Sequence, residues 1–194
     1  MGDGLTSTDV SEKSKLVNQQ LGTKPIVLIG LMGAGKSTVG RRIANYLNRP
    51  FIDSDNEIEK AAGMPIPDIF ETHGEDEFRA GEVRVISRLL TENKNTVIAT
   101  GGGAFMNEET RDNIKRHAIS LWLDADINLL FERVSRRNTR PLLRTADPFG
   151  TLKALYDARN PTYALADVKV TSFDGTHEAV AAKAIDALAS YLTA

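Results

Sequence analysis

Residues 30–37 carry the strongest chemical signal in the chain. They read Gly-Leu-Met-Gly-Ala-Gly-Lys-Ser and match the pattern G-x-x-x-x-G-K-[ST], between an apolar run and a helical pattern. Glycines there let successive backbone N–H groups face phosphate oxygens, and the following helix adds the positive end of its dipole. Lys36 can reach the β- and γ-phosphates of a nucleotide, and the Ser37 hydroxyl can ligate Mg²⁺. We expect the nucleotide to contact Gly33, Ala34, Gly35, Lys36, Ser37 and Thr38.

Two carboxylates after the second apolar run are candidates for metal and proton chemistry. A second Mg²⁺ ligand usually ends a neighbouring strand, but the run at residues 96–99 leads into glycines without an acid. Asp53 and Asp55 are two residues apart, so in an extended segment both would point to one side, toward the phosphate loop. One could serve the metal and the other the substrate. The alternative is that Asp53 or Ser54 only caps a helix starting near residue 56.

Two features are suited to holding an acceptor molecule. Arg79 and Glu82 share one face of a helical stretch, so the acid could fix a guanidinium fork for a substrate carboxylate. Taken alone, such a pair is more often a surface ion pair. Gly101, Gly102 and Gly103 follow the third apolar run, where ligands of open α/β sheets bind, and they allow close approach of the backbone. A tight turn would explain only one or two of these glycines.

A cluster of arginines marks residues 137–150 as a candidate mobile lid. Three turn-type breaks interrupt this segment, and phosphate charge is the natural target of its arginines. A nucleic-acid patch is disfavoured, because no aromatic residues are interleaved and the chain is not basic. The clustered residues are Arg133, Arg136, Arg137, Arg140 and Arg144.

From residue 24 onward, short β-rich runs alternate with longer helical patterns, which predicts an α/β fold around a parallel sheet. We expect strands at residues 26–29, 50–53, 96–99, 120–123 and 168–171. Residues 56–91 form an inserted helical region within a single domain spanning residues 24–194. The polar residues 1–23 are expected to be a flexible extension, in which a short helix could form near residues 15–21.

Apolar spacing identifies two of the helices. Residues at i, i+3, i+4 and i+7 behind Asp126 predict a helix from residue 127, and an apolar stripe from Ala181 to Leu192 predicts a closing helix.

Composition narrows the classes of partner. The 194 residues carry 24 basic and 26 acidic side chains, so no overall field attracts nucleic acid or an anionic membrane. The longest apolar stretch, residues 25–34, is far shorter than the roughly 20 residues that cross a bilayer. The absence of Cys suits a reducing, cytoplasmic location. His73, His117 and His177 lack metal-ligand spacing and are interpreted as surface or capping residues. We expect a monomer that binds only small molecules.

Together these motifs resemble the shikimate kinase family from residue 25 to the C-terminus. The likeness is carried by residues 30–38, 51–55, 78–82 and 100–103, with Thr-Arg-Pro-Leu-Leu at 139–143 beyond them. It implies a three-layer P-loop kinase fold with a five-stranded parallel sheet in the order 2-3-1-4-5. It also implies ATP-dependent phosphorylation of the 3-hydroxyl of shikimate, with Mg²⁺, on the way to chorismate and the aromatic amino acids.

The resemblance also implies roles for individual residues. Asp55 would bind the ring hydroxyls and act as general base, while Asp53 would help to hold Mg²⁺ with Ser37. Arg79 and Arg159 would bind the substrate carboxylate together with Gly101, Gly102 and Gly103. Arg140 would belong to a lid over the ATP phosphates, and Arg136 would pack on adenine. Spacing through the lid varies among relatives.

Two other functions remain open at this point. One is a related small-molecule kinase for gluconate or a nucleoside monophosphate on the same scaffold. The other is a nucleotide-binding switch that hydrolyses ATP only to change partners; the paired Asp53 and Asp55 disfavour it.

Overall fold

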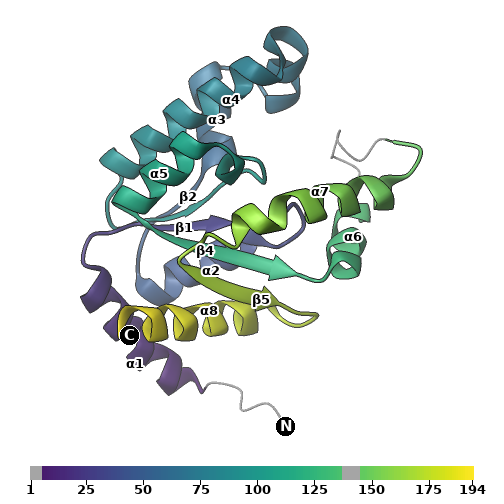
Figure 1. The fold of residues 1–194 in the computed structure, drawn as a ribbon. Coiled ribbons are helices and arrows are strands. Elements are labelled where there is room, and N and C mark those ends of the chain that lie inside the picture. The colour runs from purple at the N-terminus through teal and green to yellow at the C-terminus, as the bar shows by residue number, and fades with distance from the viewer. Residues whose placement is uncertain (1–5, 137–144) are drawn as a thin grey trace.

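A five-stranded parallel sheet organises the molecule. The structure is a computed structural model that describes residues 6–136 and 145–194. Its strands follow the order β2-β3-β1-β4-β5, and every neighbouring pair is parallel (Figure 1). This confirms the predicted α/β fold and its strand order, with each strand within one or two residues of its predicted position. The strands are β1 (Ile26–Ile29), β2 (Phe51–Asp53), β3 (Val97–Ala99), β4 (Ile119–Ala125) and β5 (Val168–Ser172).

Helices cover both faces of this sheet (Figure 1). On one face lie α1 (Ser7–Leu21), α2 (Lys36–Leu47) and α8 (His177–Leu192), and on the other lie α4 (Ile66–Glu92) and α5 (Glu108–His117). The remaining helices are α3 (Ser54–Ala62), α6 (Ile127–Ser135), α7 (Pro148–Tyr163) and the 3₁₀ helix Ala104–Met106. Because both faces are covered, β1 and β3 are buried along their whole length, whereas edge strand β5 alternates between buried and exposed residues.

The N-terminal extension forms a helix. It includes the short helix considered for residues 15–21, but the prediction of a flexible tail is wrong from Ser7 onward. Helix α1 packs against α8 and α2. It buries Val10, Val17 and Leu21, which lie on one stripe of the helix. The polar composition of the segment obscured this stripe, because only a few apolar residues are needed to dock a helix onto an existing core.

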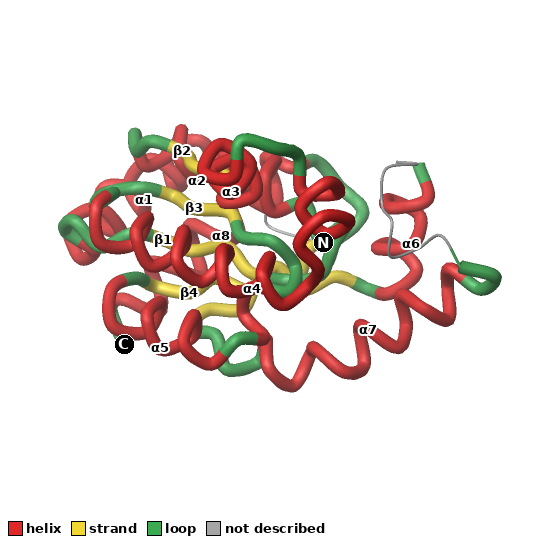
Figure 2. The backbone as a smooth tube through the Cα atoms, turned by 90° about the horizontal axis from the view of Figure 1, so that it is seen from above, coloured by secondary structure: helices red, strands yellow, loops and turns green. Residues whose placement is uncertain are grey.

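The inserted region between β2 and β3 is helical, as predicted. Helices α3 and α4 account for it, and α4 is kinked at Gly74, whose φ of 82° breaks the helical path. The tube in Figure 2 shows the length of α4 from above. Of the predicted lid, residues 137–144 lie outside the described residues, and Pro148 already begins helix α7.

The two helices predicted from apolar spacing are both present. Asp126 caps α6 by accepting a hydrogen bond from the backbone N–H of Asn128, and α8 buries Ala181, Ile185 and Leu188 in the core. Across residues 6–136 and 145–194, no helix has the length and apolar content needed to cross a membrane.

Candidate active site

The carboxyl ends of β1, β2 and β3 lie side by side at one end of the sheet, where ligands of such sheets bind. A cavity of about 380 Å³ lies there. Its walls come from the phosphate-binding loop after β1, the end of β2, the glycines after β3, helix α6 and the segment before α8. Among its lining residues are Gly33, Gly35, Lys36, Ser37, Thr38, Asp53, Asp55, Gly101, Gly102, Arg133, Arg136 and His177.

The loop at residues 30–37 has the backbone shape that phosphate binding needs. Gly33 has a φ of 84°, and a Cβ there would lie 2.9 Å from Cγ1 of Val134, so only glycine fits. Gly35, also left-handed, is the N-cap of α2, which places the helix N-terminus at the cavity. Lys36 Nζ donates hydrogen bonds to the carbonyl oxygens of Gly30 at 2.7 Å and Leu31 at 3.1 Å, which hold the ammonium over the loop.

Ser37 and Asp53 come together as the candidate metal ligands. Ser37 Oγ donates a hydrogen bond to Asp53 Oδ2 at 2.7 Å, and Asp53 Oδ1 accepts one from the backbone N–H of Asp55 at 3.2 Å. Asp53 is therefore both the N-cap of α3 and a neighbour of the phosphate loop, so the two alternatives drawn from the sequence coexist. The prediction that Asp55 lies in an extended segment is wrong, because the residue is in the first turn of α3. Its side chain still lines the same cavity.

The oxygen chemistry of this pair suits Mg²⁺. A hydroxyl and a carboxylate are hard donors, and Mg²⁺ is usually held by one or two protein groups together with water and phosphate oxygens. Within residues 6–136 and 145–194, no group of three or more His, Asp and Glu side chains could enclose a metal by itself. The residues present therefore fit a nucleotide-bound Mg²⁺ better than a metal caged by protein.

The turn at residues 101–103 is in close contact with three charged side chains. A Cβ on Gly103 would lie 2.6 Å from Nη1 of Arg79. A Cβ on Gly101 would lie 2.9 Å from Glu82 Oε1 and 3.0 Å from Asp55 Oδ1. The glycines thus permit the close approach of side chains to the backbone that we predicted. As a result, Asp55 and Arg79 both lie against the same turn.

Glu82 holds Arg79 from a buried position. Its Oε2 lies 2.7 Å from Nη1 of Arg79, and its side chain is only 2% exposed. Burial raises the pKa of Glu82, and nearby Asp55 raises it further, while Arg79 and Arg159 act in the opposite direction. Exposed Glu75 gives Arg79 a second, weaker partner at 3.3 Å. The predicted ion pair between Arg79 and Glu82 is therefore present and lies against the glycine turn, although neither residue lines the 380 Å³ cavity.

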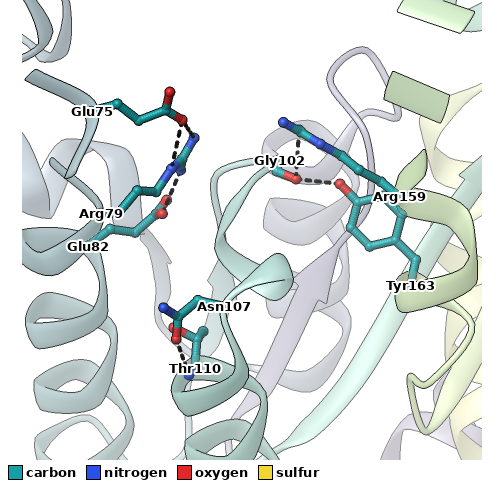
Figure 3. Close-up of polar contacts among 8 residues, drawn as sticks. All are labelled: Glu75, Arg79, Glu82, Gly102, Asn107, Thr110, Arg159 and Tyr163. Atoms are coloured by element: carbon teal, nitrogen blue, oxygen red, sulfur yellow. Dashed lines mark hydrogen bonds and ion pairs between the residues drawn. The ribbon is translucent and has the colours of Figure 1, made fainter. Parts of the chain in front are cut away.

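Arg159 approaches the same turn from the opposite side (Figure 3). Its Nη1 donates a hydrogen bond to the carbonyl oxygen of Gly102 at 3.3 Å. Arg79 comes from α4 and Arg159 from α7, so the two guanidinium groups flank the glycine turn. This arrangement offers two cations to a carboxylate placed beside the turn.

Some residues of the site were missed or misjudged from the sequence. Tyr163 Oη also donates a hydrogen bond to Gly102, and nothing in the local sequence around Tyr163 indicates this contact. His177, interpreted as a surface or capping residue, lines the cavity beside Gly35.

Two arginines of the predicted lid cluster also line the cavity. Arg133 donates hydrogen bonds to Ser172 Oγ at 3.2 Å and to the carbonyl of Phe173 at 3.1 Å, so it ties α6 to the end of β5. Arg136 is exposed at the cavity wall and pairs with Glu132. Arg140 lies outside the described residues.

Comparison with known proteins identifies the family of this chain. The family model for shikimate kinase matches residues 32–189. The shikimate kinase of Rhodopseudomonas palustris is 57% identical over 174 residues, which cover 90% of this chain and 85% of the relative. That of Brucella canis is 50% identical over 185 residues, covering 95% of this chain and 92% of the relative.

Among solved structures, the shikimate kinase from Acinetobacter baumannii in complex with shikimate superposes with a TM-score of 0.84 at 37% identity, covering 90% of this chain and 97% of that chain. Sequence and fold agree: the chain belongs to the shikimate kinase family.

Proposed function

We propose that this site transfers the γ-phosphoryl group of ATP to the 3-hydroxyl of shikimate, giving shikimate 3-phosphate and ADP. Family membership supports the reaction, which serves aromatic amino acid biosynthesis. The observation that carries the proposal is the position of Arg79 and Arg159 on both sides of the glycine turn that Asp55 also approaches. A carboxylated, hydroxylated ring satisfies both kinds of group at once.

On the acceptor side, the two guanidinium groups bind the shikimate carboxylate. Arg79 is fixed for this by buried Glu82, so its fork loses little conformational freedom on binding. With the carboxylate held at the turn, ring hydroxyls face Asp55, whose Oδ1 lies close to Gly101. Because the turn has no side chains of its own, Asp55 and Arg79 can both lie directly against it.

The transfer itself needs positioning and charge balance more than covalent help from the protein. Asp55 orients the 3-hydroxyl and accepts its proton as that oxygen forms a bond to the γ-phosphorus. The bond between the γ-phosphorus and the bridging oxygen breaks, and ADP leaves. Lys36 stabilises the charge on the transferred group. From the family resemblance, we assign to Arg140 the same stabilisation of phosphate charge. The contact of Arg136 with adenine is proposed on the same ground.

Ser37 and Asp53 are the residues that would hold Mg²⁺, since their oxygen atoms already meet at 2.7 Å. A bound Mg²⁺ would neutralise charge on the β- and γ-phosphates. The proposal also includes a cytoplasmic monomer with no nucleic-acid or membrane partner. A formal net charge of −2 supports the absence of a nucleic-acid or anionic-membrane partner.

The acceptor specificity is tested by measuring ADP release with shikimate, gluconate and AMP, with phosphorus NMR to identify the product. We expect turnover with shikimate only and formation of a 3-phosphate ester. Turnover with gluconate or AMP but not with shikimate would favour a related small-molecule kinase. ADP release at the same rate without any acceptor would favour a nucleotide switch.

A further inference from the structure

Tyr163 is a buried polar group at the site that the reaction described above does not use. It is the last residue of α7, and its side chain is almost completely buried. Its ring stacks on that of Trp122 in β4, with 6.0 Å between the ring centroids. The pKa of its hydroxyl is raised to about 12, chiefly by burial, so the group stays protonated and can donate a hydrogen bond at any physiological pH.

The hydroxyl of Tyr163 shares one acceptor with Arg159. Figure 3 shows Oη of Tyr163 and the guanidinium of Arg159 converging on the carbonyl oxygen of Gly102. The two residues are one helical turn apart, so they leave α7 on the same face. The hydrogen bond from Arg159 is long, at 3.3 Å.

This geometry suggests different functions for Tyr163 and Arg159. A backbone carbonyl in the wall of a site needs a donor, and Tyr163 supplies one from a position locked by stacking on Trp122. Arg159 is held by Gly102 through a hydrogen bond of 3.3 Å and also interacts with the Tyr163 hydroxyl, so its remaining N–H donors stay available to a substrate carboxylate. Without the hydroxyl, Gly102 would have Arg159 as its remaining donor and would compete with the substrate for it.

We propose that Tyr163 is a positioning residue for the acceptor: it satisfies the carbonyl of Gly102 and thereby frees Arg159 to bind the substrate carboxylate. This inference rests on the proposed function, because it assigns to Arg159 the carboxylate of shikimate. It concerns affinity for the acceptor and not for the nucleotide, since the contacts of Tyr163 are with the glycine turn and with β4.

The test is the substitution Tyr163→Phe, which keeps the ring on Trp122 and removes only Oη. We expect the KM for shikimate to rise about tenfold, as for the loss of a hydrogen bond at a buried acceptor, with the KM for ATP within about twofold of wild type. Tyr156→Phe is the matched control on the same helix. The Tyr156 hydroxyl makes no hydrogen bond with any residue in 6–136 or 145–194, so this variant should behave like wild type. Equal changes in both KM values, or no change in either, would overturn the inference.

A double-mutant cycle tests the route through Arg159. If Tyr163 acts by freeing this arginine, adding Tyr163→Phe to an Arg159→Lys background should change the KM for shikimate by less than about threefold. The same tenfold effect in both backgrounds would show that the hydroxyl acts on the turn alone and would refute the coupling.

A measurement on the unaltered protein covers the case in which Tyr163→Phe does not fold. The chain has four tyrosines, so ¹³Cζ labelling gives four resonances, and Phe substitution of each of the other three identifies that of Tyr163 by elimination. Shikimate should shift the Tyr163 resonance most, and no shift at saturating shikimate would contradict the inference. If wild type itself fails to phosphorylate shikimate, the proposed function falls; if wild type is active and only these tests fail, the inference alone falls.

Discussion

Gly103 and Arg79 lie so close together that no side chain fits between them. A Cβ on Gly103 would meet the guanidinium at 2.6 to 2.8 Å, and the end of the flexible arginine would have to move. Gly103→Ala should therefore displace the Arg79 fork from its position beside the turn. We expect a rise of about tenfold in the KM for shikimate with little change in the KM for ATP, measured by steady-state kinetics.

Gly81→Ala in α4 is the control for this substitution. A Cβ there meets only the end of the Arg84 side chain, at 3.8 Å, which is an ordinary contact. Because alanine favours a helix interior, this variant should gain about 0.5–1 kcal/mol of stability and keep both KM values. An unchanged KM for shikimate in Gly103→Ala would show that the position of Arg79 does not control acceptor binding.

Glu82 should make stability depend on pH in a predictable direction. Its pKa is raised in the folded protein, mainly by burial, from an ordinary value of 4.5. The native state therefore binds the proton more tightly than the unfolded state, so this contribution is complete below about pH 4.5 and is lost as pH rises through the raised pKa. Urea unfolding of wild type and Glu82→Gln from pH 4.5 upward measures it.

The free energy of unfolding of wild type minus that of Glu82→Gln should fall with increasing pH, because only wild type must ionise a buried acid. A difference that is constant or that rises across this range would contradict the assignment.

Helix α1 contributes to stability although it lies far from the chemistry. Val17 is fully buried against the core, so Val17→Ala should cost about 2 kcal/mol, the order expected for removing two buried methyl groups. Gln19→Ala, on the exposed face of the same helix, should stay within about 0.5 kcal/mol of wild type. Urea unfolding distinguishes the two, and equal stabilities would mean that α1 is not part of the cooperative unit.

The same helix shows where sequence reasoning fails for whole elements. Strand positions were predictable because apolar β-branched runs bounded by glycines, prolines and polar residues leave few alternatives for a buried parallel strand. In residues 7–21 the apolar stripe is narrow and average composition is polar, so the docking of α1 onto α8 could not be foreseen without the tertiary surface. Its capping box, formed by Thr6 and Asp9, is the local sequence signal for the start of this helix.

For the site, predictability depended on whether the signal was local. The phosphate loop could be located from eight consecutive residues, and Asp53 and Asp55 from their spacing, although Asp55 proved to be helical. Arg159 was predicted only from the family resemblance, because it is 57 residues away in sequence from Gly102, the residue to which it donates a hydrogen bond. Tyr163 had no signal at all: a tyrosine at a helix end looks like ordinary core until the turn it contacts is placed beside it.

The molecule as a whole brings five distant chain segments together at the candidate site. Parallel strands place the phosphate loop, Asp53 and the glycine turn at the same end of the sheet. Helices α4 and α7 each contribute one arginine beside the turn. Nucleotide and acceptor are thereby predicted to meet end to end, with the acceptor oriented by its carboxylate. The grip of the two arginines on that carboxylate is the claim on which the proposed reaction most depends.

The most direct test compares kcat/KM for shikimate and its methyl ester, which keeps the hydroxyls but lacks the charge. Wild type should prefer the acid by about a hundredfold, as for losing charge-assisted hydrogen bonds to two guanidinium groups. In Arg159→Met the preference should fall below about tenfold, because one of the two partners is gone. Equal use of acid and ester by wild type would show that the arginines do not hold the substrate carboxylate.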